Sequence, residues 1–197
     1  GGPDVLKYVD LPTPKPGPGE VLVKAHAIGV CMPEIYVRQG VYAWMPKLPL
    51  IPGIEMSGTV VEAGAGCSKL RVGQKVFVCA REFEERANCY AEYIAGPENR
   101  IYAVPDGVDL DQVAGLANYQ VAWHLLNSAL KGFQYESALV IAAAGGVGTA
   151  LVQLAGVAAL ELLPFRLELA FQRGCPAERG GLGKAPGCGL ELVQVCL

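Results

Sequence analysis

Residues 138–155 read ALVIAAAGGVGTALVQLA, and this stretch decides the fold that the sequence predicts. Its first five residues, 138–142, are all apolar, which is typical of a short strand buried in a parallel sheet. A glycine-rich turn occupies residues 143–148, and a helix is expected from Thr149 towards residue 163, just before Pro164. A strand, a glycine loop and a helix in this order indicate the first unit of a dinucleotide-binding sheet.

The glycine loop has the residue types that close contact with a pyrophosphate requires. Unpaired N–H groups and the helix dipole favour an anion at a helix N-terminus. Gly145 lacks a Cβ and lets a phosphate approach the backbone, while Gly148 lets the helix pack against the strand. The loop therefore supplies these candidate cofactor contacts: Ala143, Ala144, Gly145, Gly146, Val147 and Gly148. Ala143 replaces the first glycine of the G-x-G-x-x-G pattern, and an ordinary tight turn is the alternative interpretation.

The residue that would select between NAD and NADP is not evident. The pattern expects an acidic residue, or an arginine for a 2′-phosphate, at the end of the next strand, about 20 residues on. Glu161, Arg166 and Glu168 lie near that distance, but no convincing strand precedes any of them. The residues alone leave the cofactor choice open.

Upstream of the loop, residues 1–117 predict an all-β domain. A proline-rich stretch, residues 11–19, is expected to be an extended surface loop because proline lacks the N–H that helices and inner strands need. Short strands punctuated by glycine and proline are expected at 20–29, 56–64, 76–79, 90–95 and 100–104. They suggest a small barrel. Two helical stretches, 110–117 and 120–130, then lead to the glycine loop.

Downstream, the sequence changes character. Residues 150–197 contain no Ser, Thr, Asp, Asn, Ile, Tyr, His, Met or Trp, and residues 174–189 show neither helical nor strand periodicity. This composition resembles GC-rich DNA translated out of frame, so we expect the sequence to be truncated or frame-shifted after about residue 156. The predicted domains are a barrel at 1–117, the start of a nucleotide-binding domain at 118–163, and a tail of no assigned fold at 164–197.

Composition excludes several classes of protein. With 52% hydrophobic and 18% charged residues, the 197-residue chain can form a sizeable core. A net charge of −3 without a basic block argues against nucleic-acid binding, and no apolar run reaches the roughly 20 residues of a membrane span. Seven cysteines without regular spacing or a C-x-x-C pair argue against a disulfide framework and a structural zinc site. A reducing, cytoplasmic location is expected.

Four segments in order carry a family resemblance: residues 1–6, 29–40, 49–58 and 142–148. They resemble the quinone oxidoreductase (zeta-crystallin-like) branch of the medium-chain dehydrogenase/reductase superfamily. The resemblance implies an α/β chain (α+β overall), with a GroES-like β-barrel domain followed by the first β-α unit of an incomplete Rossmann domain. It also implies hydride transfer from NADPH, with NADH left open, to a quinone or an α,β-unsaturated carbonyl.

The resemblance also assigns roles to residues. Tyr36 matches the family's active-site tyrosine, whose phenol can polarise a carbonyl oxygen as charge develops on it. A packed aromatic on a short helix is the alternative for Tyr36. Cys31 is a second catalytic candidate, Arg38 and Tyr42 are candidates for the substrate pocket, and Asn118 is a candidate cofactor contact.

A catalytic metal is not expected. Zinc-dependent members of the superfamily use a cysteine, a Gly-His-Glu segment and a later cysteine, and Cys31 and Glu55 match two of these positions. Ile54 stands at the histidine position and cannot bind a metal, which leaves fewer than the three protein ligands that catalytic zinc needs. Cys31 then becomes a small side chain that lines a pocket.

Three functional hypotheses remain from the sequence. The first is a zinc-free NADPH-dependent oxidoreductase acting on a small quinone or enone, inactive or poorly active as this short chain because one β-α unit cannot bury both faces of a sheet. The second is a non-catalytic GroES-like binding module. The third is a relative of zinc-dependent alcohol dehydrogenases. Dimers are common in the resembling family, so a homodimer is among the expected assemblies.

Overall fold

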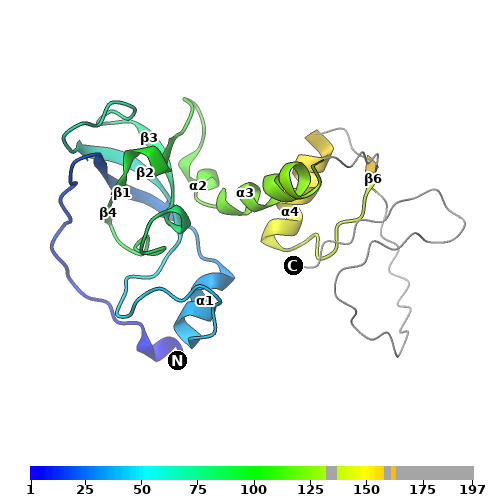
Figure 1. The fold of residues 1–197 in the computed structure, drawn as a ribbon, viewed down its shortest axis with the longest axis horizontal. Coiled ribbons are helices and arrows are strands. Elements are labelled where there is room, and N and C mark those ends of the chain that lie inside the picture. Colours follow the sequence, from blue (N-terminus) through cyan, green and yellow to red (C-terminus); the bar gives the residue numbers. More distant parts are fainter. Residues whose placement is uncertain (132–136, 158–160, 163–197) are drawn as a thin grey trace, which may run out of the picture. The chain divides into compact units, whose positions relative to one another are not determined.

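The computed structural model of the chain describes residues 1–131, 137–157 and 161–162 (Figure 1). These residues belong to two compact units, Gly1–Ala117 and Asn118–Leu197. No helix in the described part of the chain is long and apolar enough to cross a membrane.

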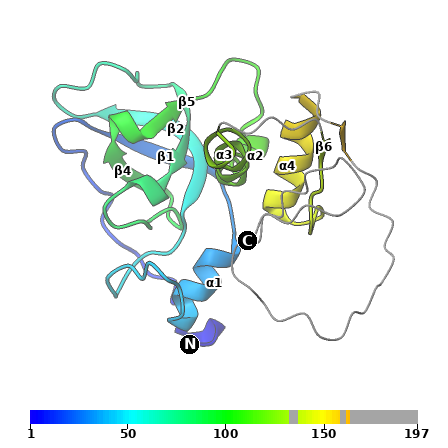
Figure 2. The same cartoon turned by 45° about the vertical axis from the view of Figure 1, so that its right-hand side comes forward.

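The first unit is built on a five-stranded antiparallel sheet with the order β4-β1-β2-β3-β5 (Figures 1 and 2). The strands are β1 (Glu20–Ile28), β2 (Glu55–Ala63), β3 (Lys75–Cys79), β4 (Tyr93–Pro97) and β5 (Ile101–Ala103). The sheet forms a half-barrel with β4 and β5 at its edges. The central strand pairs bring Val23 opposite both Val60 and Ile94. These β-branched residues suit a pleated, buried surface.

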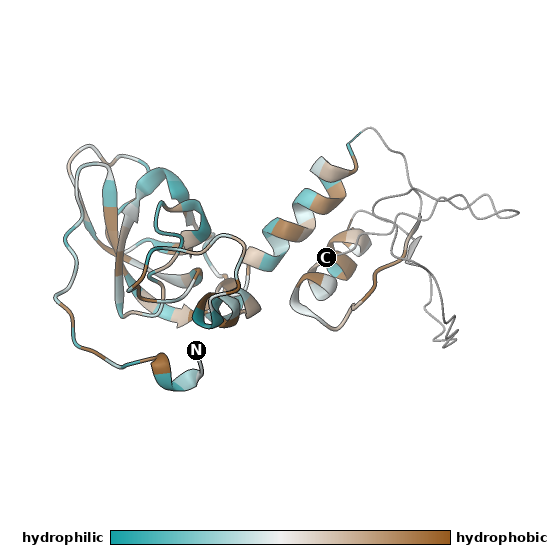
Figure 3. Cartoon of the chain, turned by 60° about the horizontal axis from the view of Figure 1, so that its bottom comes forward, coloured by the Kyte–Doolittle hydropathy of each residue, from teal (hydrophilic) through white to brown (hydrophobic). Residues whose placement is uncertain are grey.

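The sheet buries apolar side chains on both faces, as the alternation along β3 shows. Val76 and Val78 belong to a larger core cluster, whereas Phe77 and Cys79 belong to a smaller one. Successive residues of a strand point to opposite faces, so one strand serves both clusters. The smaller cluster is completed by Leu110, Val113 and Ala117. Figure 3 shows apolar and polar residues interspersed along the strands.

Short helices precede, connect and follow the strands of this unit. They are η1 (Pro3–Val5), α1 (Met32–Gln39), η2 (Ala80–Glu82), η3 (Glu98–Arg100) and α2 (Leu110–Val113). Helix α1 has Pro33 in its first turn, where a missing N–H costs nothing. It ends at Gly40, whose φ of 80° is the left-handed conformation that favours glycine.

The second unit contains one parallel β-α-β arrangement. Its elements are α3 (Ala117–His124), the π-helical turn η4 (Leu125–Ala129), β6 (Ser137–Ala138), α4 (Gly146–Val157) and β7 (Glu161–Leu162). Strands β6 and β7 pair in parallel, with Ser137 opposite Glu161 and Ala138 opposite Leu162.

The structure confirms the fold class that the sequence predicted for the first unit. One predicted strand is shifted along the chain. Strand β4 begins at Tyr93, three residues after the predicted start, and ends at Pro97. The reason is that residues 88–90 donate backbone hydrogen bonds to residues 51–53 instead of joining the sheet. Tyr90 N–H, for example, donates to the Pro52 carbonyl at 2.8 Å.

Two predictions in the second unit are wrong in detail. The strand expected at 138–142 ends at Ala138, and Ala142 has a φ of 56°, a left-handed conformation that cannot continue a strand. Ile141 is consequently 55% exposed. A strand does occur at Glu161, where none was expected, and it contains Glu161 itself. Helix α4 ends at Val157, and Arg166, Glu168 and the predicted tail at 164–197 lie outside the described residues.

Candidate functional site

A buried carboxylate fixes the start of helix α1. Glu34 is only 8% exposed, and its Oε2 accepts the Cys31 N–H at 3.0 Å. Its Oε1 accepts the N–H of Ile54 at 3.2 Å. One side chain therefore ties the helix to the segment that enters β2. Burial raises the pKa of the Glu34 carboxyl above its ordinary value, against the opposing effect of these backbone hydrogen bonds.

A second buried carboxylate lies beside the candidate Cys31. The Cys31 Sγ donates to Glu55 Oε1 at 2.8 Å, and Glu55 Oε2 accepts the N–H of Ala117 at 2.8 Å. Burial, followed by this hydrogen bond to Glu55, raises the pKa of the Cys31 thiol far above its usual range. Cys31 is therefore a protonated hydrogen-bond donor at neutral pH rather than a thiolate.

The neighbourhood of Cys31 offers few metal ligands. Ile54 is 7% exposed and presents only carbon at the position between Gly53 and Glu55. Within residues 1–131, 137–157 and 161–162, no group of three or more His, Cys, Asp or Glu side chains is arranged to hold a metal ion.

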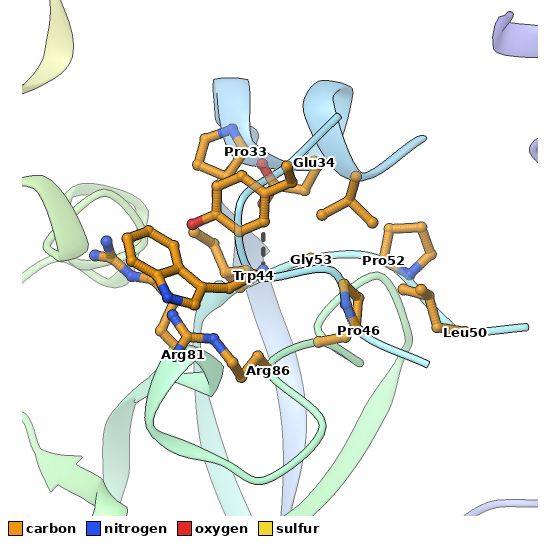
Figure 4. A pocket seen from close by; sticks show the side chains of 13 residues that line it. Pro33, Glu34, Trp44, Pro46, Leu50, Pro52, Gly53, Arg81 and Arg86 are labelled. Atoms are coloured by element: carbon orange, nitrogen blue, oxygen red, sulfur yellow. Dashed lines mark hydrogen bonds between the residues drawn. The ribbon is translucent and has the colours of Figure 1, made fainter. Parts of the chain in front are cut away.

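A pocket opens between helix α1 and the segments around residues 42–54 and 81–87 (Figure 4). It is a shallow surface depression, because most of its volume of about 360 Å³ is open to solvent. Its wall is mostly apolar, with one acid and two bases: Pro33, Glu34, Val37, Tyr42, Trp44, Pro46, Leu50, Pro52, Gly53, Ile54, Arg81, Arg86 and Ala87. The wall thus presents an apolar surface with three charged groups.

The aromatic and basic side chains of the pocket contact one another. Tyr42 and Trp44 pack edge to face, with ring centroids 5.8 Å apart. The Arg86 guanidinium carbon lies 5.7 Å from the centroid of the Trp44 ring, within range of a cation–π interaction. Arg81 Nη2 donates to the carbonyl of Ala117 at 3.0 Å.

One of the sequence-predicted residues of this unit lines the described pocket. Tyr42 lines the pocket, whereas Cys31, Tyr36 and Arg38 are not among the described lining residues. Tyr36 lies on α1 and is 41% exposed, so it is not a fully packed aromatic. Arg38 is half-buried, and its backbone carbonyl accepts a hydrogen bond from the N-terminal ammonium of Gly1.

In the second unit, the glycine loop turns tightly into α4. Gly145 N–H donates to the Ala142 carbonyl at 2.9 Å, and Thr149 Oγ1 donates to the Ala143 carbonyl at 3.1 Å. A Cβ added to Gly148 would lie 2.2 Å from the Ala142 carbonyl oxygen. Only glycine fits there without moving the backbone. Residues 143–146 are exposed, Val147 is half-buried and Gly148 is buried.

Asn118 packs against this loop. A Cβ added to Gly146 would lie 2.6 Å from Asn118 Nδ2, so the missing side chain of Gly146 makes room for the amide. The structure thus brings Asn118 next to residues 143–148, the group with which the sequence associated it.

Each of the two histidines has a side-chain partner nearby in the structure. His26 Nε2 lies 3.1 Å from Asp111 Oδ1, and His124 Nδ1 lies 3.2 Å from Ser128 Oγ.

Besides Tyr42, which was predicted, the pocket is shaped by residues that sequence reasoning missed, among them Glu34, Trp44 and Arg86. Glu34 had a signal, because a capping box places an acidic residue three positions after the residue that caps a helix. Glu34 stands three positions after Cys31 and makes that contact. Trp44 and Arg86 had none, since only the folded chain brings residues so distant in sequence together.

Comparisons with known proteins cover both units. Residues 17–106 match the alcohol dehydrogenase GroES-like domain. Rat quinone oxidoreductase is 37% identical over 165 residues, which is 83% of this chain and 49% of the rat protein. Human quinone oxidoreductase is 35% identical over the same shares. The chain thus spans about half the length of the curated relatives it matches.

Solved structures give the same result. Escherichia coli quinone oxidoreductase in complex with NADPH superposes with a TM-score of 0.73 at 28% identity, over 82% of this chain and 48% of that one. The mycobacterial protein Rv1454c in complex with NADPH has a TM-score of 0.71 at 37% identity, over 82% and 49%. The half-barrel, the glycine loop and these similarities agree, and the chain is similar to the quinone oxidoreductase branch of the medium-chain dehydrogenase/reductase superfamily.

Proposed function

We propose that this protein transfers hydride from NADPH to a quinone or an α,β-unsaturated carbonyl compound without a zinc ion. The observation that carries the proposal is the glycine loop at residues 143–148. Relatives named quinone oxidoreductases, and two similar structures in complex with NADPH, support the choice of cofactor and acceptor.

The loop fits the pyrophosphate of a dinucleotide. Gly145 has only the Ala142 carbonyl oxygen near its absent Cβ, at 3.3 Å, so its outer side is open. The residues at the start of α4 are exposed, and the first N–H groups of a helix have no partner within it. An anion placed there gains hydrogen bonds and a favourable dipole. The Asn118 amide beside Gly146 adds a polar group to the same surface.

The protein's own residues would bind and polarise, while the cofactor supplies the hydride when it is bound. Residues 143–148 and Asn118 would hold the dinucleotide. The hydroxyl of Tyr36 would donate a hydrogen bond to the carbonyl oxygen of the acceptor, where negative charge develops, and Tyr42 would line the substrate pocket. Tyr36 is exposed enough to reach a ligand, and Tyr42 lines the pocket beside Trp44.

The zinc-free part of the proposal rests on the donor set around Cys31. Its thiol is committed to Glu55, and its raised pKa opposes the thiolate form that zinc prefers. Ile54, which directly precedes Glu55, is apolar and adds no metal ligand. Cys31 would then act as a positioning residue. Its thiol donates a hydrogen bond to the Glu55 carboxylate, which also accepts the N–H of Ala117.

The remaining expectations belong to the same proposal. Residues 1–117 would be the substrate domain and residues 118–163 the start of the cofactor domain. The 197-residue chain by itself would turn over slowly or not at all, because a complete dinucleotide site uses two mononucleotide-binding halves and the described residues hold one β-α-β unit. We further propose a cytoplasmic location and a homodimer.

The experiment that tests the proposal measures cofactor binding rather than turnover. The purified chain is titrated with NADPH to millimolar concentration while nicotinamide fluorescence is recorded. Saturable binding is expected, and Gly145→Val is expected to weaken it at least tenfold because a branched side chain blocks the approach of the phosphate. Gly156→Ala, in open space on the same helix, is the matched control. Absence of binding by the unmodified chain would contradict the proposal.

A further inference from the structure

The pocket beside Trp44 contains an arginine whose polar atoms are not fully used. Arg86 Nε is buried and has no hydrogen-bond partner. A buried donor without an acceptor costs free energy of folding. The Arg86 backbone adds to this cost, since its φ of 53° is a left-handed conformation that non-glycine residues rarely adopt. Such strain is typical of sites that bind ligands.

The charge of the pocket wall is positive. Arg81 and Arg86 both line it, and no ion pair of either guanidinium occurs within the described residues. The one acid of the wall, Glu34, already accepts N–H groups from Cys31 and Ile54. The two arginines therefore have charge available for a ligand.

The aromatic part of the wall is accessible as well. Trp44 is 63% exposed although it is among the largest apolar side chains of the unit. Figure 4 draws Arg81 and Arg86 towards the Trp44 end of the pocket, and Leu50 and Pro52 towards the other end. An exposed indole next to a guanidinium matches a flat ring that carries an acidic group.

We propose that this pocket binds a planar aromatic molecule with an anionic substituent, its ring against Trp44 and its acidic group on the guanidinium of Arg86. The inference rests on the proposed function, which it deepens by naming the acceptor class: aromatic quinones or enones that carry a carboxylate or a similar acid. Arg81 adds positive charge, but its Nη2 is held by the Ala117 carbonyl, so Arg86 provides the specific contact.

The test uses naphthoate as the probe and naphthalenemethanol as its neutral counterpart. Equilibrium dialysis with the full chain, without any cofactor, measures the affinity of each compound. Naphthoate is expected to bind about tenfold more tightly or better, because a hydrogen bond to an ionised acceptor is roughly twice as strong as a neutral one. Binding of neither compound, or equal affinity for both, would overturn the inference.

Variants locate the contacts. Arg86→Met is expected to lower naphthoate affinity about tenfold and to leave naphthalenemethanol unaffected, whereas Trp44→Ala weakens both compounds. Arg86→Lys keeps the charge but not the planar fork, so it retains part of the preference for naphthoate. Arg71→Met, at an exposed turn, is the control and changes neither affinity. An Arg86→Met variant that folds normally and keeps full naphthoate affinity would refute the assignment.

The two proposals fail separately. Loss of naphthoate binding together with intact NADPH binding would overturn the pocket assignment alone. Intact naphthoate binding without NADPH binding would overturn hydride transfer from NADPH and leave a binding pocket in the first unit.

Discussion

Among single residues, Glu34 joins three pieces of chain through one carboxylate. Its two oxygens accept N–H groups from Cys31 and Ile54, and the residue also lines the pocket. Burying this carboxyl has a cost, which its raised pKa reflects, yet removing it would leave two N–H groups without an acceptor. The position therefore tolerates little change.

Glu34→Ala is expected to lower the free energy of unfolding by about 2–4 kcal/mol, the cost of leaving two buried donors unpaired. Urea denaturation followed by circular dichroism measures the change. Glu84→Ala, at an exposed position two residues before Arg86, should stay within about 0.5 kcal/mol of the unmodified chain. Equal effects of the two substitutions would show that the Glu34 contacts contribute nothing.

Glu98 is a carboxylate with the opposite titration behaviour. It accepts the N–H groups of Ser68, Lys69 and Leu70 at 3.0, 2.7 and 2.7 Å. These bonds, that of Leu70 first, hold the pKa of Glu98 below its ordinary value. A carboxyl whose pKa is lower in the folded chain stabilises the fold above its unfolded-state pKa. That stabilisation is lost as the pH falls through the folded-state pKa.

Replacing Glu98 by glutamine should therefore destabilise the chain most at neutral pH. The difference in unfolding free energy between the unmodified chain and Glu98→Gln is expected to be constant above about pH 5 and to shrink towards zero at lower pH. Urea midpoints measured at a series of pH values from neutral to about pH 3 give the difference directly. A difference that does not change with pH would mean that Glu98 is not held as a carboxylate.

At the scale of elements, two of the three glycines of helix α4 are in opposite situations. Gly148 has the Ala142 carbonyl oxygen 2.2 Å from the place of a Cβ, whereas Gly156 has nothing within 4 Å. Glycine in a helix interior costs up to about 1 kcal/mol relative to alanine, so only a packing reason justifies it. The structure supplies that reason at Gly148.

The same substitution at these two positions should have opposite signs. Gly148→Ala is expected to destabilise the second unit by about 1–3 kcal/mol, because the added methyl group collides with backbone. Gly156→Ala is expected to stabilise α4 by up to about 1 kcal/mol through helix propensity. Hydrogen exchange of the α4 amides measures the stability change within this unit. Increased protection of these amides in Gly148→Ala would disprove the close packing.

The elements that the sequence predicted well are those with a local cause. Strand β1 follows a proline-rich stretch and is filled with β-branched and apolar residues, and it occupies the expected residues to within one position. Strand β6 was predicted too long because its apolar run is shared with a turn, and only the left-handed backbone of Ala142 shows where the turn begins. Hydrophobicity cannot distinguish those two uses of alanine.

The residues of the candidate site likewise fall into those with a local signal in the sequence and those without one. The glycine loop and Asn118 are close in the structure and could be named from a short motif and its neighbourhood. The contact of Arg86 with Trp44, by contrast, depends on the turn of chain between β3 and β4, which no local pattern specifies. Cys31 could be selected by position, but burial and then its hydrogen bond to Glu55 raise the pKa of its thiol, and both need the fold.

At the scale of the whole molecule, the core of the first unit is made of the unit's own residues. Both apolar clusters lie within residues 1–117, as do the pocket and the buried carboxylates. Ala117 completes it, because its N–H is accepted by Glu55 and its carbonyl accepts from Arg81. In the described part of the second unit, the fully buried apolar side chains are small ones, those of Ala122, Ala150 and Ala155.

A fragment of residues 1–117 is therefore expected to fold alone, with a cooperative urea transition and dispersed amide resonances. A fragment of residues 1–106 is the control. It lacks Leu110 and Val113, which cover Phe77, and it leaves Glu55 without the Ala117 N–H. Since burial of one such apolar side chain contributes about 1.5–3 kcal/mol, the shorter fragment should be less stable by about 3 kcal/mol or more. Equal stability of the two fragments would show that the smaller cluster contributes little. Failure of the longer one to fold would show that the half-barrel depends on residues after Ala117.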